Sequence, residues 1–191
     1  MERKYAWHNY DDATMEKVYA LSDTYRQFLD NGKTERECVV QAVEFAEAKG
    51  YVNLNDIIKS NTSIKAGDKI YYTHMDKSIA LFNIGTDDIE LGMNILGAHI
   101  DSPRIDVKQN PQYENSNLVF WDTHYYGGIK KYHWVAMPLA IHGVVVKTDG
   151  TRININIGDK ESDPVFCITD LLPHLGQEQM QKNAAKVIEG E

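Results

Sequence analysis

The chain has 191 residues, 42% apolar and 25% charged, and its 28 acidic residues outnumber 20 lysines and arginines to give a net charge of −8. This composition is typical of a globular protein and excludes a wholly disordered chain. The acidic balance argues against a nucleic-acid partner, which would need a basic surface. No apolar run is long enough for a transmembrane helix, and the N-terminus lacks the apolar core of a signal peptide. Cys38 and Cys167 are interpreted as reduced thiols. We therefore expect a cytoplasmic protein with no membrane partner.

The start of the chain predicts two helices. Apolar side chains recur at helical spacing over residues 12–30, and Asn31-Gly32 supplies a stop, because glycine tolerates the left-handed backbone of a helix C-terminus. The next helix begins after Thr34, which forms the signature of a capping box with Glu37. Its buried face is predicted to comprise Cys38, Val39, Ala42, Val43 and Ala46.

Strands are predicted next along the chain. Residues 69–74 and 78–84 have the composition of two strands joined by a short turn. Residues 93–98 form a nearly continuous apolar run, which is typical of a strand buried on both faces. We therefore expect a central strand that ends immediately before His99.

The remainder of the sequence is mostly β in pattern. Strands are predicted at residues 104–108, 118–125, 133–137, 139–147, 151–157 and 164–168, followed by short helices at 169–175 and 178–188. The pattern as a whole indicates the α/β class. It divides the chain into a first domain, residues 1–103, and a β-rich second domain, residues 104–191.

The first candidate functional site is the pair His99 and Asp101 at the end of the predicted buried strand. Residues two apart in an extended backbone project to the same side, and the carboxyl ends of strands are where open α/β sheets build their sites. A neutral imidazole is a good zinc ligand, and a neighbouring carboxylate can orient it. The alternative is a loop histidine beside an unrelated aspartate, because His-x-Asp by itself is a weak signal.

The second candidate is the stretch of residues 121–134, in which aromatic residues, histidines, lysines and a Gly-Gly pair crowd together. The functional interpretation is a binding loop in which His133 or a lysine contacts a substrate. The alternative is an aromatic-rich strand pair with its connecting turn.

Three segments together resemble the M18 family of zinc aminopeptidases, in particular its bacterial aminopeptidase 1 branch. Residues 97–104 resemble the family's G-x-H-x-D-S-P motif. Tyr126-Gly127-Gly128, followed by His133-Trp134, resembles its Y-G-G block. Residues 163–166 and 168–175 resemble the segment that follows the family's β-hairpin.

The resemblance implies the start of a zinc-peptidase α/β domain in residues 1–103 and a β-rich dimerisation domain in residues 104–191. It implies an enzyme that removes N-terminal residues from peptides, with two divalent metals per active site, usually zinc and alternatively cobalt or manganese. It also implies a homo-oligomer built from dimers, typically a dodecamer. On this pattern His99 matches a metal ligand, and Asp101 matches the catalytic carboxylate that orients it. His133 is carried over as a second catalytic residue, in a segment that approaches an active site, either its own or that of a neighbouring subunit.

The implied chemistry is amide hydrolysis by a metal-activated water. A catalytic zinc needs about three protein ligands, and His99 alone can be assigned from these residues. We therefore expect the chain to be the N-terminal portion of a longer aminopeptidase and to be inactive by itself.

Two alternatives come from other functional classes. One is a non-catalytic self-association module that uses the strands within residues 139–157. The other is a sugar- or peptide-binding β domain that uses the aromatic side chains between Trp121 and Trp134.

Overall fold

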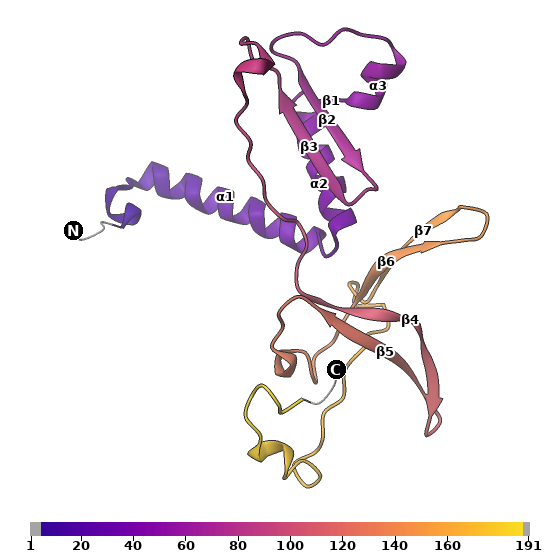
Figure 1. The fold of residues 1–191 in the computed structure, drawn as a ribbon. Coiled ribbons are helices and arrows are strands. Elements are labelled where there is room, and N and C mark those ends of the chain that lie inside the picture. Colours follow the sequence, from indigo (N-terminus) through magenta and orange to yellow (C-terminus); the bar gives the residue numbers. More distant parts are fainter. Residues whose placement is uncertain (1–4, 189–191) are drawn as a thin grey trace. The chain divides into compact units, whose positions relative to one another are not determined.

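The computed structural model describes residues 5–188 and divides into two compact units, Met1–Asp101 and Ser102–Glu191 (Figure 1). Helices and strands both occur, so the predicted mixed α/β class is confirmed. Within residues 5–188, no helix combines the length and the apolar character needed to cross a membrane.

The first unit begins with a short 3-10 turn, η1 (Ala6–Asn9), and two helices, α1 (Asp12–Asn31) and α2 (Glu35–Ala48). Both helices start where the sequence predicts. The Asp11 carboxylate accepts the backbone N–H of Thr14 at 2.9 Å and caps α1. At α2 the predicted capping box is complete, because Thr34 Oγ1 accepts the Glu37 N–H while Glu37 Oε2 accepts the Thr34 N–H.

The capping box makes Thr34 a test of local stability. Replacing Thr34 with alanine removes the acceptor for the Glu37 N–H, so we expect the free energy of unfolding to fall by about 1 kcal/mol. Urea unfolding followed by circular dichroism at the helical band measures the change, since both long helices belong to the first unit.

The matched control is Thr24→Ala within α1, where the exposed hydroxyl donates to the Ala20 carbonyl of the same helix. We expect that change to stay within about 0.5 kcal/mol. Equal losses from the two threonine substitutions would contradict the capping role.

Gly32 ends α1 for a reason that differs from the one predicted. Its φ of −115° lies outside the left-handed region, so the conformational argument was wrong. Glycine is required here by the lack of room for a side chain, because a Cβ at this position would lie 2.8 Å from Cys38 Sγ and 3.0 Å from the Phe28 carbonyl oxygen. Glycine is therefore what lets the end of α1 approach the first turn of α2.

The sheet of the first unit has the strand order β1-β2-β3, made of β1 (Val52–Asn53), β2 (Lys69–His74) and β3 (Ser78–Asn83). β1 and β2 are parallel and are connected through α3 (Leu54–Lys59), whereas β2 and β3 form the predicted antiparallel hairpin. Helix α2 packs against β2 and β3.

The core of the first unit lies between α2 and this sheet. Its buried members are Cys38, Val39, Ala46, Ile70 and Tyr71, while Ala42 and Val43 of the predicted helix face are half-buried. The Tyr71 hydroxyl donates to Glu47 Oε1 at 2.6 Å, and this bond to a carboxylate raises the pKa of the tyrosine because it favours the protonated phenol.

The predicted strand at residues 93–98 is absent, and this prediction was wrong. After a short turn, η2 (Ile89–Leu91), residues 92–103 belong to neither a helix nor a strand and form the coil that leads from β3 to β4 (Figure 1). A strand exists only as a paired structure, and no strand among residues 5–188 pairs with this segment. The apolar pattern indicates burial, but it does not supply the partner.

The second unit contains two antiparallel hairpins. The first joins β4 (Arg104–Asn115) to β5 (Leu118–Tyr126), with an irregularity in register between Val107 and Gln112, and the second joins β6 (Ile141–Val146) to β7 (Arg152–Ile157). Four of the predicted strands therefore form, and β4 is longer than predicted. Of the aromatic stretch, residues 121–126 belong to β5, which pairs with β4, and residues 131–133 form a 3-10 turn. The alternative of a strand pair with its connecting turn inside residues 121–134 was therefore wrong.

Four other predicted elements of the second unit were wrong. Residues 133–137 and 164–168 contribute only isolated bridges, Val135 to Ile168 and Leu139 to Phe166, beside a 3-10 turn, η3 (Lys131–His133). No helix forms at 169–175, where Pro173 restricts the residue before it, and 178–188 has only the 3-10 turn η4 (Gln179–Gln181). Met180 remains 63% exposed, so a helix there would bury little apolar surface within this unit.

Candidate functional site

The first candidate pair, His99 and Asp101, lies in the coil at the end of the first unit. His99 Nδ1 is 2.9 Å from the backbone oxygen of Asp101 and 3.2 Å from its carboxylate Oδ1. A carbonyl and an ionised carboxylate can only accept hydrogen bonds, so Nδ1 donates to them, and in the neutral imidazole this leaves the lone pair on Nε2. The two side chains therefore come together as predicted, although the backbone between them is not a strand.

This geometry has the form of one metal ligand with its orienting carboxylate. The His99 side chain is 83% exposed and that of Asp101 is 37% exposed, so Nε2 is accessible. Among residues 5–188, no three histidine, cysteine, aspartate or glutamate side chains lie close enough to hold a metal ion. A catalytic zinc needs about three protein ligands, so the described residues do not make a complete zinc site.

His133 lies at the end of η3 in the second unit, so it belongs to a different unit from His99. Its exposed ring meets the ring of Tyr132 edge to face, with centroids 4.6 Å apart. Beside it, Tyr125, Gly128, residues 129–132, Ala184 and Ala185 line a shallow hollow of about 410 Å³. The Lys131 ammonium sits over the Tyr125 ring at 5.0 Å, so part of the positive charge of this loop is used in an internal contact.

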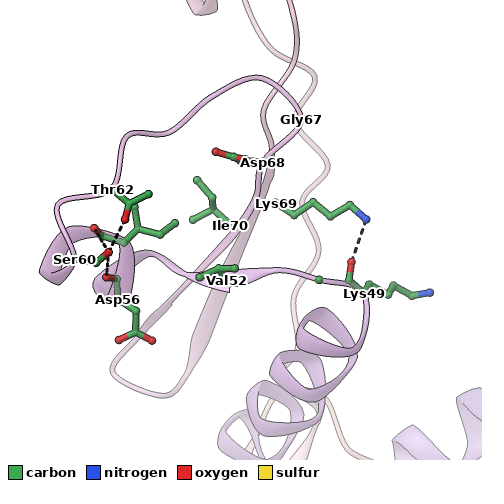
Figure 2. A pocket seen from close by; sticks show the side chains of 11 residues that line it. Lys49, Val52, Asp56, Ser60, Thr62, Gly67, Asp68, Lys69 and Ile70 are labelled. Atoms are coloured by element: carbon green, nitrogen blue, oxygen red, sulfur yellow. Dashed lines mark hydrogen bonds between the residues drawn. The ribbon is translucent and has the colours of Figure 1, made fainter.

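A hollow of about 680 Å³ in the first unit lies between β1, β2 and the loop after α3 (Figure 2). None of the candidate residues lines it. Figure 2 shows that its polar groups bond one another: Lys69 Nζ donates to the Lys49 carbonyl at 3.1 Å, and Ser60 Oγ bonds Thr62 Oγ1 at 2.8 Å. Its lining also includes the apolar side chains of Val52, Ile57 and Ile70 and the carboxylates of Asp56 and Asp68.

A second histidine–aspartate pair lies on the β6–β7 hairpin and was not singled out from the sequence. His142 Nε2 is 3.2 Å from Asp159 Oδ1, and Asn156, which is paired with His142 in the sheet register, donates to Asp159 Oδ2 at 3.0 Å. The His142 side chain is only 9% exposed, so the pair braces the base of the hairpin rather than presenting a ligand. Its members are 17 residues apart, and only the register of the hairpin could have revealed it.

Comparison with known proteins places the chain in a family. The sequence profile described as "Aminopeptidase I zinc metalloprotease (M18)" matches residues 28–189. The Probable M18 family aminopeptidase 1 of Clostridium acetobutylicum is 52% identical over 190 residues, which is 100% of this chain and 41% of that protein. The protein of the same name from Thermotoga maritima is 46% identical over 182 residues, which is 93% of this chain and 38% of that protein.

Solved structures agree with the sequence comparison. The crystal structure of aminopeptidase I from Clostridium acetobutylicum matches with a TM-score of 0.84 at 52% identity, covering 100% of this chain and 42% of that one. An M18 family aminopeptidase from Thermotoga maritima matches with a TM-score of 0.86 at 44% identity, covering 97% and 39%. The chain thus spans about two-fifths of the length of the relatives that it matches.

Proposed function

Because the chain belongs to the M18 family of zinc aminopeptidases, we propose that it is the N-terminal portion of a metal-dependent enzyme that removes N-terminal residues from peptides. The activity belongs to the longer polypeptide, since the described residues offer one oriented histidine where a catalytic zinc needs about three ligands. The observation that carries the proposal is the His99–Asp101 pair. It holds Nδ1 at 2.9 Å from an acceptor and leaves Nε2 exposed within the region that matches the family.

Each candidate residue has a separate proposed role. His99 is a metal ligand through Nε2, and Asp101 fixes the tautomer and orientation of its ring. His133 approaches the active site of a neighbouring subunit. Zinc, two ions per active site with cobalt or manganese as alternatives, supplies Lewis acidity and an activated water in the complete enzyme.

The two units have distinct proposed roles. The first is the opening part of the peptidase domain, and the second is the dimerisation domain of a homo-oligomer built from dimers, up to a dodecamer. Both hairpins of the second unit are two-stranded, so among residues 5–188 each strand has one edge without a neighbour in its sheet. Such edges are suited to pairing with another chain.

The experiment compares the chain alone with a chimera in which it replaces the matched portion of the Clostridium acetobutylicum relative. We expect the chimera to release N-terminal residues from free peptides, to leave N-acetylated peptides intact, and to lose activity on chelation until zinc is restored. We expect the chain alone to show no turnover. A folded chimera without activity would contradict the aminopeptidase proposal, and metal-dependent turnover by the chain alone would contradict its inactivity.

A non-catalytic self-association module is the second candidate. Val145 and Val146 at the end of β6 are 50% and 61% exposed, which is surface that a second copy could cover. This candidate predicts that the chain alone forms a stable, metal-free dimer in sedimentation and that the chimera has no peptidase activity.

A further inference from the structure

The second unit begins with two residues whose backbone has little conformational freedom. The ring of Pro103 fixes its own φ, and a residue that precedes a proline is restricted to extended conformations, so Ser102 is stiff as well. Asp101 is the last residue of the first unit, and Ser102 is the first residue of the second. The chain therefore leaves the candidate metal pair through a stiff step.

Arg104, the first residue of β4, contacts this step from the C-terminal side. Its guanidinium carbon lies 4.2 Å from the centroid of the Tyr126 ring, which is its partner in the strand register. Its Nε donates to Asp106 Oδ1 at 2.7 Å, and its Nη1 donates to the Ser102 carbonyl at 3.4 Å. The Arg104 side chain is only 26% exposed. A ring on one face and a carboxylate at the edge therefore fix the guanidinium that reaches back to Ser102.

The residue after Tyr126 lies against the same stiff step. Gly127 has a φ of +71°, in the left-handed region that favours glycine, and the chain turns here at the end of β5. A Cβ built on Gly127 would lie 3.5 Å from Pro103, at ordinary van der Waals distance, so the backbone of this turn packs on the proline. Tyr126 and Gly127 thus contact Arg104 and Pro103, respectively.

One peptide plane connects these contacts to the candidate metal ligand. The Asp101 carbonyl oxygen, 2.9 Å from His99 Nδ1, lies in the plane of the peptide group that also contains the Cα of Ser102. A rotation of this plane would take the acceptor away from Nδ1. In the neutral imidazole, the nitrogen that carries the proton is set by the hydrogen bond that the ring makes. The orientation of the peptide group at Ser102 therefore bears on the tautomer of His99.

We propose that Arg104 and Tyr126 form a clamp on this peptide group, and that the clamp keeps His99 in the Nδ1–H tautomer, in which Nε2 is available to a metal. Both members of the clamp are positioning residues, because they act through the backbone of Ser102. The effect on the tautomer follows from the contacts within this chain, whereas its consequence for metal binding rests on the proposed function.

The first test reads the tautomer by heteronuclear NMR of the ring nitrogens in the metal-free chain, under conditions in which the imidazole is neutral. The signals of His99 are those that His99→Ala removes. We expect the Nδ1–H form to be the majority in the unmodified chain, and to lose that majority in Arg104→Met and in Tyr126→Leu. Tyr126→Phe keeps the aromatic face for the cation and should retain the majority.

The matched control is Lys108→Met, which removes a 3.7 Å ion pair with Asp122 from the same two strands. It should leave the tautomer unchanged. Arg104→Lys is the milder substitution if Arg104→Met fails to fold, and it should give an intermediate population, because an ammonium keeps the charge but not the planar fork.

Three results would overturn the proposal. One is an Nδ1–H majority that survives in both Arg104→Met and Tyr126→Leu. Another is an Nε2–H majority in the unmodified chain. The third is an equal loss in Lys108→Met, which would assign the effect to the hairpin as a whole.

The chimera tests the consequence for metal binding. We expect Arg104→Met to weaken zinc binding and to lower kcat on the order of 10-fold. KM should stay within about 2-fold, because the clamp does not contact substrate. A shifted tautomer with unchanged zinc affinity and kcat would leave the clamp standing and remove the metal role of His99. Loss of zinc in His99→Ala, with no effect of Arg104→Met on tautomer or kcat, would do the reverse.

Discussion

His99→Ala in the chimera is expected to lower kcat/KM for peptide hydrolysis by at least about 1,000-fold, because it removes the metal ligand that we propose for this metal-dependent reaction. Zinc content measured by elemental analysis should fall in parallel. The isolated chain should unfold at an unchanged denaturant concentration, because the His99 side chain is 83% exposed and its hydrogen bond joins it to Asp101, only two residues away.

Asp101→Asn is expected to have a smaller effect, about 10- to 100-fold. Asparagine removes the charged acceptor at 3.2 Å from His99 Nδ1 but keeps the backbone oxygen at 2.9 Å, so the ring retains one of its two acceptors. His74→Ala on β2 is the control, and we expect activity within about 2-fold of the unmodified chimera. A His99→Ala chimera with full zinc content and full activity would remove His99 from the site.

Gly158→Ala is expected to lower the free energy of unfolding of the second unit by about 2–4 kcal/mol. Gly158 has a φ of +111°, which L side chains rarely adopt, and an added Cβ would lie 2.9 Å from the Ala140 Cα. The backbone here is also constrained, because the Gly158 N–H donates to Asp163 Oδ2 at 3.1 Å. The fluorescence of Trp121 and Trp134 during urea unfolding follows this unit, with Trp7 replaced by phenylalanine.

Gly150→Ala provides the matched comparison in the β6–β7 turn. Its φ is +85°, but nothing lies within 4 Å of the position of a Cβ, so only the conformational cost of about 1 kcal/mol remains. If the two glycine substitutions had equal effects, the close approach of Gly158 to Ala140 would not contribute to stability.

Local sequence determined the elements whose signals lie within a few residues of one another. The capping box of Thr34 and Glu37, the start of α1 after Asp11 and the hairpin of β2 and β3 all formed where the sequence predicted them. The contact between His99 and Asp101 belongs to the same class, because two residues of separation keep their side chains within reach even without a strand. Short-range hydrogen bonds and turns need no information from distant parts of the chain.

Tertiary structure decided everything that depends on a partner far away in the sequence. It left residues 93–98 unpaired, reduced residues 133–137 and 164–168 to isolated bridges, and brought His142 to Asp159 through the register of β6 and β7. It also decided why position 32 is a glycine: a Cβ there would lie too close to Cys38, whereas the backbone conformation does not require glycine. An apolar pattern states that a segment should be buried, but which surface buries it depends on distant residues, and here the chain accounts for only 41% of the relative that it matches.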